Sequence, residues 1–268
     1  MADESWLSLC TPSNIPMPPL ERYIHHLPHH ILKKRLGPHE LGVGGYIPDH
    51  STLKYRDENE VLALELVRNH TNIPVPDLVY MGADFNVFTR IPGICVNHQE
   101  IWDTISPRQR EGLQYQIRSY IRQLSHIPSP YPGHVHSPHP SGSIFRPYQL
   151  QHCGPFPSTS SLLLHNPHLS PLVSASALPV FAHMDWDLSN IIIAENGDAV
   201  VGVVDWERAA WFPDAGRAMH RCAHHWEGWE GLFDTLEFPV GGGGGEGMGE
   251  TGVVGEVGQL RWWGEAYY

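Results

Sequence analysis

His183-Met-Asp185-Trp-Asp-Leu-Ser-Asn190 and the residues that follow it, as far as Glu207, decide the fold of this chain. Two β-branched runs within 191–204 flank an Asn-Gly pair, a sequence typical of a β-hairpin turn. Positions 190 and 205 are symmetric about that turn, so an antiparallel pair closed there brings both residues to the open end of the hairpin. The spacing therefore predicts that Asn190 and Asp205 lie roughly opposite one another.

The open end of this hairpin carries the chemistry of a metal site. An amide oxygen from Asn190 and a carboxylate from Asp205 are hard ligands of the kind that suits Mg²⁺. Asp185 lies five residues before Asn190, on the loop that enters the hairpin, where its carboxylate can accept a proton. One base beside two metal ligands is the equipment that phosphoryl transfer requires.

This run resembles the catalytic segment of the aminoglycoside phosphotransferase and choline kinase-like family, whose usual pattern is His-Gly-Asp, four residues, Asn, a hairpin and Ile-Asp-Trp-Glu. The resemblance implies an α+β, two-lobed protein-kinase-like fold. It also implies that Asp185 is the catalytic base, that Asn190 and Asp205 hold Mg²⁺, and that His183 supports the loop. ATP and Mg²⁺ are the implied cofactors, and the implied reaction transfers the γ-phosphoryl group to a hydroxyl of an aminoglycoside- or choline-like small molecule.

The resemblance extends upstream. Leu53-Lys54-Tyr55 resembles the family's ATP-binding lysine strand, and Glu60 resembles the ion-pair partner of that lysine on the following helix. Phe88-Thr-Arg-Ile-Pro-Gly93 is similar to the hinge between the lobes. Two features depart from the family pattern: Met184 stands in place of the usual glycine, and Leu41-Gly-Val-Gly-Gly45 is read as a plain turn in preference to a phosphate-covering loop.

Hydrophobic periodicity predicts the main helices and strands. A helix is expected over Asp57–His70, with Asp57 able to cap its start, and another begins at Ser106-Pro-Arg-Gln109, a capping box with proline at the first helical position. Short strands are expected around Ile31–Lys34 and over 78–81 and 86–91.

These elements suggest four segments. Residues 1–29 form an irregular N-terminal segment, and residues 30–92 form an ATP-binding N-lobe of antiparallel sheet with one helix. Residues 93–240 form a mainly helical, catalytic and acceptor-binding C-lobe, and residues 241–268 form a glycine-rich linker and tail.

Charge and composition exclude several function classes. The 268 residues carry a formal net charge of −12, which disfavours nonspecific binding to nucleic acid or to anionic membranes. No apolar run approaches the ~18 residues that a membrane span needs. Four scattered cysteines without a CxxC pair fit a reducing, cytoplasmic setting.

Two other functions compete with the phosphotransferase interpretation. The first is a pseudoenzyme, in which the same fold binds nucleotide weakly or serves as an interaction module. The second is an iron oxygenase, in which His183 and Asp185 combine with a distal histidine, one of His220, His224 or His225, in a two-His-one-carboxylate site. The oxygenase leaves Asn190 and Asp205 without a role.

Overall fold

The computed structural model describes residues 2–96, 99–144, 150–171 and 173–213. An antiparallel four-stranded sheet forms the N-terminal part, in the order β1-β2-β4-β3. Its strands are β1 (Arg22–His26), β2 (His30–Arg35), β3 (Leu78–Met81) and β4 (Phe85–Thr89). The expectation that residues 1–29 are irregular is wrong for β1, which pairs with β2 along its whole length.

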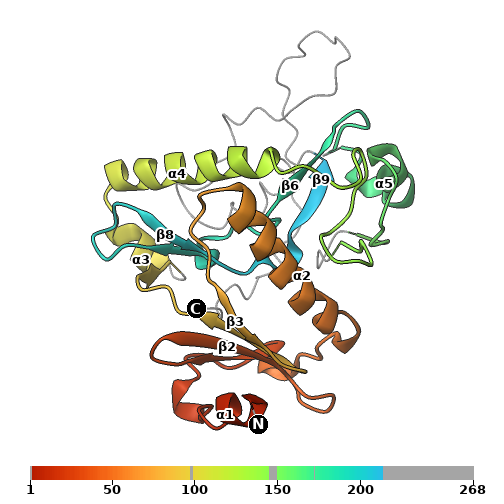
Figure 1. Cartoon of the computed structure of the whole chain (residues 1–268). Helices are drawn as coiled ribbons and strands as arrows, with labels where there is room; N and C mark the ends of the chain where they lie inside the picture. Colours follow the sequence, from red (N-terminus) through yellow and green to blue (C-terminus); the bar gives the residue numbers. More distant parts are fainter. Residues whose placement is uncertain (1, 97–98, 145–149, 172, 214–268) are drawn as a thin grey trace.

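The two faces of this sheet have different partners (Figure 1). Alternation along β2 sends Lys33 toward helix α2 (His50–His70), while Leu32 joins a small cluster with Phe85 and Val87 on the opposite face. The N-terminal helix α1 (Ala2–Leu7) covers that opposite face, where Trp6 and Leu7 pack on the cluster. One strand therefore serves a small apolar core and the candidate site at the same time.

Helix α2 begins seven residues earlier than the sequence pattern predicts. Asp49 caps it by accepting a hydrogen bond from the Ser51 amide, so Asp57, the expected cap, lies inside the helix and is buried. Thr71 ends the helix. The buried apolar residues Ala63, Leu64 and Val67 then join the main core.

The C-terminal part combines helices with two small antiparallel sheets. Helix α4 (Pro107–Ser125) carries the predicted Ser106–Gln109 capping box and buries Leu113, Ile117, Ile121 and Leu124 on one face. The other helices are α3 (Gln99–Thr104) and α5 (Thr159–His165). One sheet contains β5 (Ile94–Cys95), β7 (Ile191–Ile193) and β8 (Val200–Val203), and the other pairs β6 (Pro179–Ala182) with β9 (Ala210–Pro213).

Short 3₁₀ turns complete the described chain: η1 (Pro12–Asn14), η2 (Val43–Gly45), η3 (Pro167–Leu169), η4 (Leu188–Asn190) and η5 (Trp206–Arg208). Turns η4 and η5 flank the β7–β8 hairpin at its open end, where η4 contains Asn190 and Asp205 caps η5. Among the described residues, no helix has both the length and the apolar character needed to cross a membrane. The predicted glycine-rich tail, residues 241–268, lies outside the described residues.

Candidate active site

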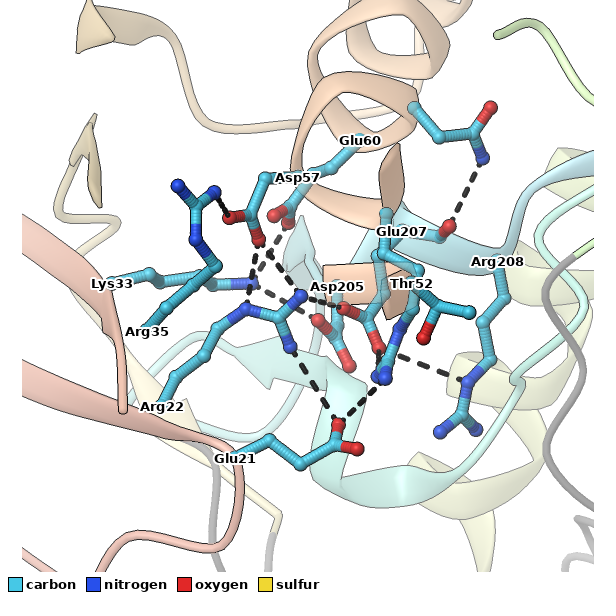
Figure 2. A network of polar contacts seen from close by, with 12 residues as sticks. Glu21, Arg22, Lys33, Arg35, Thr52, Asp57, Glu60, Asp205, Glu207 and Arg208 are labelled. Carbon is cyan, nitrogen blue, oxygen red and sulfur yellow. Dashed lines mark hydrogen bonds and ion pairs between the residues drawn. The ribbon is translucent and has the colours of Figure 1, made fainter. Parts of the chain in front are cut away.

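A lysine on the central strand β2 lies at the centre of the site. The Lys33 Nζ atom is 2.8 Å from Glu60 Oε1 on α2 and 3.0 Å from Asp205 Oδ1 at the end of the hairpin (Figure 2). Lys33 and Glu60 are both buried. Burial raises the pKa of Glu60 to about 7, although the neighbouring ammonium of Lys33 opposes that rise. Lys33 thus joins the N-terminal sheet and α2 to the β7–β8 hairpin.

The expectation that Lys54 is the strand lysine paired with Glu60 is wrong. Lys54 lies within the first turns of α2, where 66% of its side chain is exposed and its nearest acid is Glu58 at 3.8 Å. Glu60 was correctly expected on a helix and in an ion pair, but its partner is Lys33. The sequence held only a weak signal: Lys33 directly follows the apolar pair Ile31-Leu32 within the expected strand.

The β7–β8 hairpin brings Asn190 and Asp205 to the same open end, as expected. The Val204 amide donates to the Asn190 carbonyl at 3.0 Å, so Val204 lies directly opposite Asn190 and Asp205 follows it. The turn is centred one position earlier than predicted, since Ile193 pairs with Val200, and the register shift between Ile192 and Ile193 recovers part of that difference. Asp205 adopts a left-handed conformation with φ of 65°, which turns the chain away from the strand at this point.

His183 holds the loop between β6 and the hairpin. Its Nε2 atom is 2.8 Å from the Val204 carbonyl, and its Nδ1 accepts from the Asp185 amide at 3.2 Å. These partners define a neutral imidazole that donates through Nε2. Burial lowers the pKa of His183 to about 4, which preserves that neutral form, and the ring contacts Trp186 and Trp206. The contacts are those that a loop-supporting histidine needs.

Asp185 lies on this loop with its carboxylate in an ion pair. Its Oδ2 atom is 3.0 Å from Nη1 of Arg208, and 17% of the Asp185 side chain is exposed. Burial raises the pKa of Asp185 to about 6, against the opposing charge of Arg208. The Asp185 carbonyl accepts a hydrogen bond from the Asn190 side chain at 3.0 Å, which ties the candidate base to the candidate metal ligand.

An apolar pocket opens beside Lys33, between the N-terminal sheet and the β5–β7–β8 sheet. Its lining includes Ile31, Phe88, Ile91, Cys95 and Val204 together with Lys33 and Glu60. The segment expected to be the hinge, 88–93, forms part of this lining. A pocket with apolar walls that ends at Lys33 and Glu60 suits a flat ring attached to phosphates.

Solved structures with the same arrangement of sheets and helices include aminoglycoside phosphotransferases. Aminoglycoside 2'-phosphotransferase-IIIa in its GDP complex matches with a TM-score of 0.56 and 12% identity, covering 87% of this chain and 80% of that one. The gentamicin complex of APH(2")-IIa matches at 0.51 and 14%, covering 82% and 74%. The fold is that of the aminoglycoside phosphotransferases. No protein-family model matches the sequence, and no curated protein matches it either.

Two features set this chain apart from the pattern expected for aminoglycoside phosphotransferases. Met184 replaces the usual glycine yet keeps a left-handed backbone, with φ of 68°, and it is buried in the main core. The 41–45 segment forms the turn η2 after the Lys33 strand, as the plain-turn interpretation predicts. A Cβ atom at Gly42 would approach the Leu20 carbonyl oxygen to 2.0 Å, so packing accounts for that glycine.

Asp205 and Asn190 offer the carboxylate and amide oxygens that suit Mg²⁺. Mg²⁺ is usually bound through one or two carboxylates, with substrate phosphates and water completing its coordination. Within the described residues, no group of three or more His, Cys, Asp or Glu side chains could hold a metal ion. The donor set therefore fits a metal that arrives with a nucleotide, and it does not form a metal cage made of protein ligands alone.

The iron-oxygenase alternative fails at His183. Both ring nitrogens of His183 are engaged by the backbone, at Val204 and at Asp185, so neither is available to a metal. The distal histidines proposed for that site, His220, His224 and His225, lie outside the described residues.

A buried ionic cluster beside the site was not found by sequence analysis (Figure 2). Its members are Glu21, Arg22, Arg35, Arg56, Asp57 and Glu207. Burial alone would raise the pKa of Glu207, but Arg22 and Arg56 outweigh it and hold that pKa well below the ordinary value. No local pattern signals such a cluster, because its members are separated by up to 186 positions and meet only in the folded chain.

Proposed function

We propose that the chain is an ATP-dependent phosphotransferase that moves the γ-phosphoryl group to a hydroxyl of a small molecule. The observation that carries the proposal is the position of Lys33, which bridges Glu60 and Asp205 beside Asp185 within an aminoglycoside phosphotransferase fold. A lysine, its acidic partner and a metal-binding carboxylate are the parts that orient the phosphates of a nucleotide in kinases.

Each residue of the site has a proposed role. Lys33 binds nucleotide phosphates while Glu60 holds its ammonium, a pair that takes the place first given to Lys54 and Glu60. Asn190 and Asp205 hold Mg²⁺, which when bound neutralises phosphate charge. Asp185 orients the acceptor hydroxyl and receives its proton, and His183 keeps the Asp185 loop in place.

The proposed acceptor is an aminoglycoside- or choline-like small molecule with a free hydroxyl. Solved structures of the same fold include complexes with gentamicin, kanamycin and streptomycin, and one is a ternary complex with ATP and streptomycin. These names support the small-molecule class of acceptor for this chain, and an acceptor screen will identify the compound.

A pseudoenzyme is the second candidate, and one observation favours it. The carboxylate proposed as the base is already paired with Arg208 at 3.0 Å, and Met184 alters the loop that carries it. In this alternative the chain binds nucleotide and transfers nothing.

The primary test is calorimetric titration with ATP in the presence and absence of Mg²⁺. Asp205→Asn is the informative variant, because asparagine tolerates the left-handed backbone at this position and removes only the carboxylate. Asp77→Asn is the control, because Asp77 pairs with Arg68 and 68% of its side chain is exposed. We expect Mg²⁺-dependent ATP binding in the parent and in the control, and its loss in Asp205→Asn.

An acceptor screen with the parent then separates the two candidates. Turnover of any hydroxylated small molecule supports the phosphotransferase. Mg²⁺-ATP binding without transfer to any acceptor supports the pseudoenzyme, and absence of nucleotide binding in the parent overturns both.

A further inference from the structure

An alternating chain of charges runs from the N-terminal sheet to the candidate base. Arg22 on β1 lies 2.8 Å from Glu207, and Glu207 lies 3.8 Å from Arg208 Nε (Figure 2). Arg208 Nη1 lies 3.0 Å from Asp185. Glu207 and Arg208 are consecutive residues of η5, immediately after Asp205 and Trp206. The turn that follows the candidate metal ligand therefore delivers a guanidinium to the candidate base.

The backbone on both sides of Arg208 is held firmly. Asn59 on α2 donates to the carbonyls of Glu207 and Ala209, at 3.0 and 3.1 Å. The Glu207 carboxylate is buried between Arg22 and Arg56. Helix α2 and strand β1 fix Glu207 and Ala209, the residues on either side of Arg208. The Arg208 backbone is therefore held in place, and its side chain loses little conformational entropy when it pairs with Asp185.

The charge of Arg208 is balanced before the reaction and unbalanced during it. In the proposed reaction the acceptor oxygen bonds to the γ-phosphorus, and the bond from that phosphorus to the β–γ bridging oxygen breaks, leaving its electron pair on the diphosphate. The hydroxyl proton passes to Asp185. As Asp185 loses its negative charge, the Arg208 guanidinium 3.0 Å away keeps its positive charge.

A positive charge that becomes uncompensated as the phosphoryl group moves favours the transition state over the bound substrates. We infer that Arg208 is a positioning residue for phosphoryl transfer, which fixes the Asp185 carboxylate before the reaction and keeps its positive charge beside Asp185 as that residue takes up the proton. This inference rests on the proposed function and adds a residue to it.

Arg208→Gln and Arg208→Lys test the inference. Arg68→Gln is the matched control, because Arg68 is an arginine in an ion pair on α2 with 41% of its side chain exposed. For Arg208→Gln we expect kcat to fall roughly 10- to 100-fold, at or below the ~10²–10³ that loss of a direct transition-state donor costs. KM for ATP and the calorimetric Mg²⁺-ATP affinity should change less than about threefold. Arg208→Lys should recover part of kcat, since it restores charge without the planar fork.

Three results would overturn the inference while leaving the proposed function intact. They are an unchanged kcat in Arg208→Gln, a lysine variant no more active than the glutamine variant, and a loss of ATP affinity that matches the loss of kcat. A parent chain that binds no Mg²⁺-ATP, or binds it and transfers to no acceptor, overturns the proposed function, and the inference with it.

Discussion

Replacing Asp185 by asparagine should make the chain more stable and less active at the same time. Asparagine keeps the shape of the side chain and can still accept a hydrogen bond from Arg208, but it carries no charge to bury. Burial raises the pKa of Asp185 from 3.8 to about 6 in the folded chain. A tenfold change in an ionisation constant corresponds to about 1.4 kcal/mol, so the buried charge costs up to about 3 kcal/mol at neutral pH.

The pH dependence follows from the direction of that shift. Because the folded-state pKa lies above the ordinary value, the folded parent holds this proton more tightly than the unfolded chain does. The contribution of Asp185 to stability is therefore complete below about pH 4 and is lost as the pH rises through about 6. Asparagine at position 185 does not titrate, so the stability of the variant relative to the parent should increase between about pH 4 and about pH 6.

Urea unfolding of the parent and of Asp185→Asn at pH 4, 5, 6, 7 and 8, without metal or nucleotide, measures this difference. Asp77→Asn, on an exposed ion pair, serves as the control and should follow the parent at every pH. Turnover of Asp185→Asn should fall at least ~10²-fold, the low end of what a general base contributes. A stability difference that does not change with pH would refute the electrostatic argument, and full turnover would refute the role of Asp185 as the base.

The remaining predictions concern the lysines, the left-handed loop residue and the buried cluster. Lys33→Ala should weaken Mg²⁺-ATP binding at least tenfold by calorimetry, while Lys54→Ala, at an exposed helical position, should bind like the parent; equal losses would contradict the assignment. Met184→Gly should be more stable to urea than Met184→Ala by about 1–2 kcal/mol, because both lose the buried thioether chain beyond Cβ but only alanine keeps the strain of a positive φ. Glu207→Gln should lower the free energy of unfolding by about 3–5 kcal/mol, because it removes the acid that balances Arg22 and Arg56 in a buried cluster, and a loss below 1 kcal/mol would show that these arginines find other partners.

Local sequence was enough to define the β7–β8 hairpin. The Asn-Gly turn and the β-branched runs around it depend on neighbours a few residues away, and they placed Asn190 and Asp205 at one end of the hairpin to within one residue. The Ser106–Gln109 capping box fixed the start of α4 for the same reason, since both partners lie in one helical turn.

The lysine assignment required the tertiary structure. Both Lys33 and Lys54 precede Glu60 in the sequence, and the family resemblance placed Lys54 on a strand where the structure has helix α2. Asp49 begins α2 seven residues earlier than the apolar periodicity suggested, which carries Lys54 into the helix and out toward solvent. Only sheet pairing and the packing of α2 on the sheet show that Lys33 is the lysine directed at Glu60.

The charge network around the base depends entirely on tertiary structure. Arg22, Arg56 and Glu207 lie in three distant segments, and each carries a residue type that sequence statistics place at the surface. They are buried because β1, α2 and η5 converge on one point and supply one another with opposite charges. The sequence by itself determined which residues meet at the open end of the β7–β8 hairpin, and the tertiary structure decided which lysine and which arginine face them, because long-range contacts leave no periodic trace along a chain.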